Sequence, residues 1–166
     1  MPEAYIALGA NLGDPPQKIE QALRSLAALP GTHLRRRSSL YRSAPLGPVD
    51  QPDFCNAVCL IETTLEPLPL LDALQLIERA AGRTRGRHWG PRTLDLDLLL
   101  IPGVARADAR LQLPHPHLHE RNFVLLPLCE IAPDLEIPGH GHVRALCASV
   151  TGGRIARWHD INVADG

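Results

Sequence analysis

Two aspartates stand two residues apart in a stretch of the chain that could do chemistry. Asp95 and Asp97 alternate with leucines and lead into the apolar residues 98–100, which predicts a strand entering a core. Side chains two residues apart in a strand point to the same face, so these carboxylates project together, about 6–7 Å apart. Such a pair is costly unless positive charge lies beside it. Mg²⁺ is commonly bound by one or two carboxylates together with substrate phosphates.

The segment that precedes this strand, residues 82–92, is rich in arginine and punctuated by glycine and proline. Its four arginines are Arg83, Arg85, Arg87 and Arg92. Arginine suits paired hydrogen bonds to phosphate, so the two segments together predict a metal–nucleotide site. In the alternative interpretation, the aspartates form the solvated face of an edge strand and pair with surface arginines. The apolar residues 98–100, which predict an interior strand, and the arginines in excess of two ion pairs favour the metal–nucleotide interpretation.

Length and composition limit the classes of protein. A chain of 166 residues predicts one domain, 1–166, whose residues 151–166 are either a loose tail or include a last strand. The net charge of −1 gives no support to nonspecific binding of nucleic acid or a membrane. Three consecutive arginines at 35–37 are interpreted as a solvated strand edge rather than a nucleic-acid patch.

The cysteines and the termini indicate the compartment. The four cysteines lack zinc-like spacing and sit in apolar stretches, so they are expected to be core residues in a reducing compartment. No signal pattern is visible at the start, and no apolar run approaches the ~20 residues of a membrane span. We therefore expect a cytoplasmic protein.

Hydrophobic periodicity predicts the elements that must hold the aspartates in place. Strands are expected at residues 4–8, 32–43 and 54–64 and from residue 93, and helices at residues 15–29 and 67–81. Asp14 is the expected N-cap of the first helix, which Pro30 and Gly31 end. The order βαββαβ is the ferredoxin-like arrangement, so we expect an α+β fold with helices packed on a mostly antiparallel sheet.

Further short elements are expected outside this core. A turn is predicted at residues 102–108, a short strand at 109–113, a helix at 118–131 disturbed by Pro127, and a short helix at 143–149. Residues 44–52 and 114–117 are rich in proline and are predicted to be loops. For residues 155–158 the pattern fits a strand as well as a loose tail.

Several segments in a fixed order resemble one enzyme family. The most specific is residues 87–97, RHWGPRTLDLD, supported by residues 51–57, QPDFCNA, and residues 114–123, PHPHLHERNF. The likeness runs from residues 5–13, YIALGANLG, to residues 127–133, PLCEIAP, which is most of the chain. In these segments the chain resembles the 6-hydroxymethyl-7,8-dihydropterin pyrophosphokinases of folate biosynthesis.

The resemblance implies a reaction and a set of site residues. The hydroxymethyl oxygen of the pterin would attack the β-phosphorus of ATP, so that pyrophosphate is transferred and AMP is released. Two Mg²⁺ ions would be held by Asp95 and Asp97, with ATP as co-substrate and Arg83 and Arg92 acting catalytically on the phosphates. The implied ATP-binding residues are Gln75, Glu78, Arg83, Arg85, Arg92, Leu98, His115 and Arg121.

The resemblance also implies how the pterin binds. Phe54 and Phe123 would sandwich the ring, and Asn56 would read its polar edge. The full implied set is Ser43, Ala44, Leu46, Phe54, Asn56, Trp89 and Phe123. Ala10 and Ser43 stand where serine and threonine are expected in some relatives. Residues 85–88 are one residue short relative to some members, which leaves the roles of Arg87 and His88 unassigned.

Two other classes of protein compete with this prediction. Another metal-dependent enzyme on a ferredoxin-like fold, such as a nucleotidyltransferase or a phosphodiesterase, would use Asp95 and Asp97 but not the set of Phe54, Asn56 and Phe123. A noncatalytic binding module would gain nothing from two adjacent carboxylates. Oligomeric state and protein partners are not predicted.

Overall fold

The computed structural model describes residues 2–44, 52–81, 94–149 and 155–158 of the chain. The main sheet consists of β1 (Glu3–Ala10), β2 (Thr32–Arg37), β3 (Tyr41–Ser43), β4 (Phe54–Thr63), β5 (Asp95–Leu100) and β10 (Ile155–Arg157). The helices are α1 (Pro15–Ala27), α2 (Pro67–Ala81), α3 (Asn122–Ile131) and α4 (Val143–Ser149), with a 3₁₀ turn η1 (Leu118–Glu120). Two small hairpins pair β6 (Arg106–Ala107) with β7 (Gln112–Leu113), and β8 (Glu136–Ile137) with β9 (Gly141–His142).

The strand order of the main sheet is β10-β3-β4-β1-β5, with β2 also paired to β4. All of these pairings are antiparallel. β1 and β4 are therefore central, and among the described residues β5, which carries the two aspartates, is an outer strand. The expectation of an interior strand was thus wrong: residues 98–100 are apolar because both faces of β5 are packed against the core, not because strands lie on both sides. Topology and pairing confirm the predicted α+β, ferredoxin-like core with extra helices and strands.

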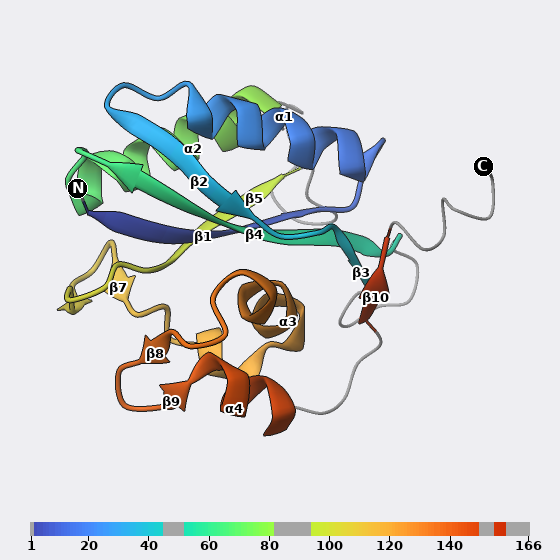
Figure 1. Ribbon diagram of the computed structural model, residues 1–166. Coiled ribbons are helices and arrows are strands. Elements are labelled where there is room, and N and C mark those ends of the chain that lie inside the picture. Colours follow the sequence, from blue (N-terminus) through green and yellow to red (C-terminus); the bar gives the residue numbers. More distant parts are fainter. Residues whose placement is uncertain (1, 45–51, 82–93, 150–154, 159–166) are drawn as a thin grey trace.

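Helices cover both faces of the sheet, α1 and α2 on one and α3 and α4 on the other (Figure 1). Alternate residues of β1 face opposite layers, because side chains of a strand alternate. Ala4, Ile6 and Leu8 pack in the cluster under α1 and α2, whereas Tyr5 packs in the cluster with α3. The central strands are thus apolar on both faces, except where the α3 side opens into a pocket.

The layer of α1 and α2 follows the sequence closely. α1 begins after Asp14, whose carboxylate accepts a hydrogen bond of 3.3 Å from the backbone N–H of Gln17, as expected of an N-cap. Gly31 then turns the chain with a φ of +63°, a conformation that favours glycine. The bounds of α2 match the predicted residues 67–81.

Two predicted elements are broken in the structure. The strand expected at residues 32–43 is two strands, because β2 ends at Arg37 and β3 begins at Tyr41. Between them, the backbone N–H of Ser38 still donates to the Val58 carbonyl at 2.9 Å, but the Ser38 hydroxyl accepts the backbone N–H of Val58 at 3.0 Å. The helix expected at residues 118–131 is η1 followed by α3, because Arg121 between them is extended, with φ −109° and ψ +110°. Pro127 lies buried inside α3, where it has no N–H to donate to the carbonyl of Phe123.

The remaining short elements show smaller differences. Part of the turn predicted at residues 102–108 is β6, and the strand expected at 109–113 is the shorter β7. Ile155–Arg157 forms a strand, β10, which pairs with β3. Of the strand and the loose tail that were both open for residues 155–158, the structure has the strand. Among the described residues, no helix is long and apolar enough to cross a membrane.

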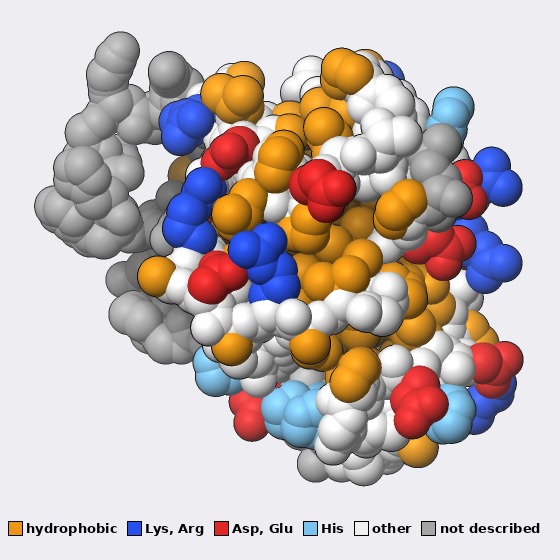
Figure 2. Space-filling view, turned by 90° about the vertical axis from the view of Figure 1, so that its left-hand side faces the viewer, with side chains coloured by type: hydrophobic (Ala, Val, Ile, Leu, Met, Phe, Trp, Pro, Cys, Tyr) orange, Lys and Arg blue, Asp and Glu red, His pale blue; other side chains and the backbone are white. Residues whose placement is uncertain are grey.

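Surface charge and cysteine burial agree in part with expectation. Figure 2 shows a face with hydrophobic side chains at its centre, acidic and basic side chains around them and histidines along its lower edge. The three arginines at residues 35–37 are exposed on β2, and Arg37 forms an ion pair of 2.7 Å with Glu20 of α1. All four cysteines are free, and Cys55 and Cys59 are buried. Cys129 and Cys147 are only partly buried, so the expectation that all four are core residues was wrong for them.

Candidate functional site

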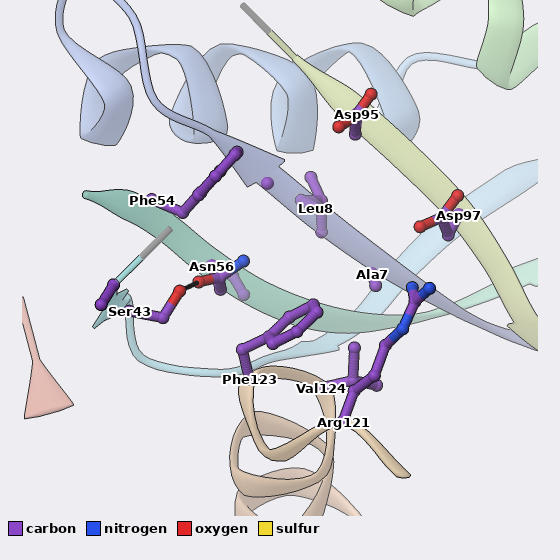
Figure 3. A pocket seen from close by; sticks show the side chains of 13 residues that line it. Ala7, Leu8, Ser43, Phe54, Asn56, Asp95, Asp97, Arg121, Phe123 and Val124 are labelled. Carbon is purple, nitrogen blue, oxygen red and sulfur yellow. Dashed lines mark hydrogen bonds between the residues drawn. The ribbon is translucent and has the colours of Figure 1, made fainter. Parts of the chain in front are cut away.

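A cavity of about 310 Å³ lies between the sheet and the start of α3 (Figure 3). Strands β1, β3, β4 and β5 and the first turn of α3 all contribute to its wall. The lining residues are Ala7, Leu8, Gly9, Ser43, Ala44, Phe54, Asn56, Ala57, Asp95, Asp97, Arg121, Phe123 and Val124. Segments that are far apart in sequence therefore meet in one pocket.

The floor of this pocket is formed by small residues of the central strand. Ala7 and Gly9 of β1 face the α3 side of the sheet, where Tyr5 of the same strand fills the core. A Cβ atom on Gly9 would stand 3.3 Å from the side-chain nitrogen of Asn56, closer than an ordinary contact. The missing side-chain volume at these positions is what opens the cavity.

Asn56 is held in a fixed orientation by Ser43. The Ser43 hydroxyl donates a hydrogen bond of 2.6 Å to Oδ1 of Asn56, and the two residues are only 6% and 7% exposed. Because Oδ1 accepts this bond, Nδ2 points toward Gly9 and the pocket. The site thus presents an oriented amide, as polar groups in ligand pockets commonly are.

Two phenylalanines flank this amide from different elements. Phe54 is the first residue of β4, and Phe123 lies in the first turn of α3; Figure 3 shows them on opposite sides of Asn56. Both side chains are partly exposed to the cavity. The guanidinium of Arg121 lies 5.7 Å from the centre of the Phe123 ring, close enough for a cation–π contact. A flat, polar-edged ligand would find stacking surfaces and hydrogen-bonding groups here.

Asp95 and Asp97 both face the pocket from β5, as the alternating pattern predicts (Figure 3). Leu94, Leu96 and Leu98 point the other way and are at most 4% exposed. The aspartates stand opposite Gly9 and Ala7 of β1 in the strand register, so small residues leave room in front of them.

The donor set at β5 fits a metal ion that is completed by a substrate. Among the residues that the structure describes, no three His, Cys, Asp or Glu side chains converge to form a protein cage for a metal. Two carboxylates that open into a cavity are instead the type of site in which Mg²⁺ keeps positions for water and phosphate oxygens. The aspartates therefore fit the predicted Mg²⁺ sites in chemistry.

Arg121 lines the pocket near Asp97 (Figure 3), whereas His115 lies outside the lining but close enough for the charges of Asp97 and Arg121 to act on it. The backbone N–H of His115 donates a hydrogen bond of 2.8 Å to the Leu99 carbonyl, which fixes this histidine beside β5. Burial lowers the pKa of His115 below its ordinary value; the Asp97 charge opposes this, and the Arg121 charge adds to it. The neutral imidazole is thus favoured, within electrostatic reach of both charged side chains.

Three further residues predicted to bind ATP lie along the outer side of β5 rather than in the pocket: Gln75, Glu78 and Leu98. Glu78 of α2 accepts a hydrogen bond of 2.7 Å from the backbone N–H of Leu96, and Gln75 accepts one of 3.4 Å from Arg110. Leu98 directs its backbone to the same outer side as Leu96, since the two are two residues apart. Its side chain is 3% exposed and packs in the cluster under α1 and α2, so it is not brought to the carboxylates.

Part of the predicted site cannot be placed. Leu46, Arg83, Arg85, Arg87, His88, Trp89 and Arg92 lie outside the described residues. Conversely, prediction from the sequence missed the pocket residues Ala7, Leu8, Gly9, Ala57 and Val124. The one signal that could have found some of them is the pair of small residues Ala7 and Gly9 on one face of an otherwise bulky strand.

Comparison with known proteins gives consistent matches. Residues 5–133 match the family model of the 7,8-dihydro-6-hydroxymethylpterin-pyrophosphokinases (HPPK). A 2-amino-4-hydroxy-6-hydroxymethyldihydropteridine pyrophosphokinase of Haemophilus influenzae is 54% identical over 135 residues, which cover 81% of this chain and 84% of the relative. The enzyme of the same name from Pseudomonas aeruginosa is 50% identical over 145 residues, 87% of this chain and 90% of the relative.

Solved structures with similar folds are more distant in sequence. A Plasmodium falciparum HPPK-DHPS triple mutant matches with a TM-score of 0.72 at 15% identity, over 89% of this chain and 44% of the solved chain. An HPPK-DHPS solved in complex with substrates gives a TM-score of 0.70 at 12% identity, over 90% of this chain and 45% of the solved chain. The present chain spans less than half of these solved chains. At such identity the likeness concerns the fold, which agrees with the ferredoxin-like topology.

Proposed function

Because the chain belongs to the 7,8-dihydro-6-hydroxymethylpterin-pyrophosphokinase (HPPK) family, we propose that its pocket holds the pterin with its hydroxymethyl group toward Asp95 and Asp97. The chain is an ATP-dependent pyrophosphokinase of folate biosynthesis. It transfers pyrophosphate from ATP to the hydroxymethyl group of 6-hydroxymethyl-7,8-dihydropterin and releases AMP. One observation carries the assignment of the site: two aromatic rings, an oriented amide and two carboxylates line the same cavity.

The size and lining of the pocket suit the pterin rather than the nucleotide. Its volume of about 310 Å³ lies at the low end of the roughly 300–1,000 Å³ of ligand pockets. The pocket therefore has room for a bicyclic ring but not for ATP in addition. Phe54 and Phe123 offer faces for stacking. Asn56 presents Nδ2 as a donor and keeps a second lone pair on Oδ1, which matches the donor–acceptor edge of a pterin amide.

The carboxylates stand where the two substrates must meet. We propose that Asp95 and Asp97 hold two Mg²⁺ ions, which when bound supply positive charge against the triphosphate and the attacking hydroxyl group. Their place on an outer strand leaves them open toward a second substrate that lies beyond the pocket. Arg121 adds a positive charge on the same side, and the substrates are aligned by positioning and electrostatics.

The nucleotide is proposed to lie along the outer side of β5. There the backbone of Leu98, together with Gln75 and Glu78 of α2, borders the nucleoside, while His115 and Arg121 border the phosphates. The neutral His115 imidazole can donate one N–H to a phosphate oxygen without adding a buried charge. The predicted phosphate ligands Arg83, Arg85 and Arg92, and the predicted pterin contacts of Leu46 and Trp89, belong to the same proposal.

The setting of the reaction completes the proposal. We propose that residues 1–166 act as one pyrophosphokinase domain in the cytoplasm, where ATP and Mg²⁺ are supplied. The partners are ATP and the pterin, and binding of nucleic acid or a membrane is not part of the function.

The experiment that tests the function resolves the nucleotide product. The protein is incubated with Mg²⁺, ATP and 6-hydroxymethyl-7,8-dihydropterin, and nucleotides are separated by chromatography. AMP that forms only with the pterin, and is lost in Asp95→Ala, supports pyrophosphoryl transfer at this site. ADP would indicate an ordinary kinase, and free pyrophosphate a nucleotidyltransferase. ATP binding without turnover would indicate a noncatalytic binding module.

A further inference from the structure

Glu130, near the end of α3, accepts several hydrogen bonds from the side of the sheet that lies away from β5. Its carboxylate accepts the backbone N–H and the hydroxyl of Ser39 at 3.0 and 2.8 Å, and the hydroxyl of Tyr41 at 2.8 Å. Arg157 of β10 adds an ion-pair contact of 3.9 Å. Nearby, Arg36 of β2 donates a hydrogen bond of 2.7 Å to the carbonyl of Ile131. The last turn of α3 is therefore tied by polar contacts to the β2–β3 edge.

Helix geometry links these contacts to the pocket. Glu130 follows Phe123 by seven residues, almost two full turns, so both side chains leave α3 on the same side. The residues of α3 that pack in the apolar core, such as Val124, Leu128 and Ile131, lie on the neighbouring side. Apolar contacts hold α3 against the sheet and decide which side of the helix is buried, but they carry less directional preference than hydrogen bonds do. Directional hydrogen bonds to Glu130 further fix the rotation of α3, and with it the position of the Phe123 ring.

The hydrogen bond between Glu130 and Tyr41 also links α3 to the other wall of the pocket, through β3. Tyr41 stands opposite Asn56 in the β3–β4 register, and Ser43, two residues further on β3, donates to Asn56. Glu130 is thus connected to one wall of the pocket through α3 and to the other through β3. The distance between Phe123 and the Asn56 amide depends on where these two elements are held relative to each other.

The charge of Glu130 suits this role. Burial alone raises the pKa of Glu130, but the hydrogen bonds from Ser39 and Tyr41 and the charge of Arg157 together lower it below its ordinary value. The carboxylate is therefore ionised near neutral pH. Burial and the hydrogen bond to Glu130 raise the pKa of Tyr41 to about 12, so its hydroxyl stays a donor. These are charge-assisted hydrogen bonds, which are stronger than neutral ones.

We propose that Glu130 is a positioning residue for pterin binding: by tying α3 to β3 it sets the spacing between Phe123 and Asn56. The proposal rests on the function assigned to the pocket. It predicts a defect that is larger for the pterin than for ATP, because the hydrogen bonds and the ion pair of Glu130 join α3 to Ser39, Tyr41 and Arg157 and not to the aspartates of β5. Loss of the carboxylate should weaken pterin binding more than ATP binding, because among the described residues proposed to bind ATP only Arg121 adjoins α3. A merely structural role would weaken both equally or neither.

The test measures binding and turnover separately in Glu130→Ala and Glu130→Gln. Pterin affinity is measured by calorimetric titration, and KM for each substrate comes from AMP formation. A charge-assisted hydrogen bond is worth enough that Glu130→Ala should weaken pterin binding about tenfold, with KM for ATP changed less than about twofold. Glu130→Gln keeps one acceptor oxygen and should recover part of the affinity. A pterin affinity equal to that of the wild type, or an equal rise in both KM values, would overturn the proposal.

Two further variants separate positioning from stability. Thr63→Val removes the buried 2.7 Å hydrogen bond between Thr63 and Thr32 at the far end of β4, and should lower stability without changing pterin affinity. Tyr41→Phe removes one donor to Glu130 and should weaken pterin binding by itself but add nothing in Glu130→Ala, because coupled residues are not additive. Additive losses would contradict the proposed connection. If the wild type itself forms no AMP with the pterin, the proposed function is wrong, and not only the role of Glu130.

Discussion

Removal of one hydroxyl group tests whether the orientation of Asn56 matters. In Ser43→Ala, Oδ1 of Asn56 loses the 2.6 Å hydrogen bond from Ser43 while both positions stay almost fully buried. A buried acceptor that loses its donor costs about 1–3 kcal/mol. At about 2–4 °C of melting temperature per kcal/mol for a chain of this size, we expect a fall of about 2–12 °C.

The same substitution should weaken binding of the pterin. Without the Ser43 hydroxyl, the Asn56 amide can exchange Oδ1 and Nδ2, and half of its orientations present the wrong group to the ring. Together with the loss of rigidity, we expect the pterin dissociation constant to rise about tenfold, equivalent to about 1.4 kcal/mol. KM for ATP should stay near the wild-type value, because Ser43 lies on β3, away from the outer side of β5.

The assay combines thermal unfolding with calorimetric titration of the pterin. Ser43→Thr is the matched control, because it keeps the hydroxyl group and should retain both stability and affinity. If Ser43→Ala melts and binds the pterin as the wild type does, the hydrogen bond does not orient Asn56 and the argument is refuted. A loss of stability with unchanged pterin affinity would show that Ser43 stabilises the fold and does not contribute to pterin binding.

Three other predictions concern the carboxylates and the thiols. Asp97→Ala should lower pterin-dependent AMP formation by about a thousandfold or more, the loss expected with a metal site, while the melting temperature stays near that of the wild type; activity near normal would exclude Asp97 from the metal site. The folded-state pKa of Glu130 lies below its ordinary 4.5, so its contribution to stability is present above about pH 4.5 and is lost as pH falls through the lower folded value. In urea unfolding, the difference in free energy between wild type and Glu130→Gln should therefore shrink in acid, and a difference independent of pH would contradict this. Burial raises the pKa of Cys55 and of Cys59 to about 12, so at pH 8 these two of the four thiols should resist maleimide until guanidinium unfolds the chain; rapid modification of all four in the native protein would show that the core opens.

Much of the fold could be predicted because its periodicity is strong. The apolar spacing of α2 and the alternation around Asp95 and Asp97 each match one pattern well, and both predictions were confirmed. The helix expected at residues 118–131 was wrong at its start. Residues 119–122 are all polar, so the apolar pattern did not fix where the helix begins, and the extended backbone of Arg121 separates η1 from α3. The local pattern also could not show that the Ser38 hydroxyl would accept a hydrogen bond from the backbone N–H of Val58, between β2 and β3.

The candidate site was predicted by resemblance more than by pattern. Phe54, Asn56 and Phe123 come from separate segments, and only their likeness to a family placed them together before the structure did. Arg121 was predicted for ATP alone, yet it lines the same cavity as the proposed pterin residues. Ala7 and Gly9 were missed because a small side chain signals no chemistry, although it is their smallness that makes the cavity.

The floor formed by Ala7 and Gly9 has a consequence for inhibitors and for resistance to them. A molecule that rests on this floor touches main-chain atoms and a single methyl group, so a substitution can remove almost none of the contact. Apart from Ala7→Gly, every substitution at these two positions adds volume, and added volume closes the cavity to the substrate as well as to the drug. Resistance arising at the floor would therefore cost the enzyme its own turnover, which leaves the rim residues as the more permissive route of escape.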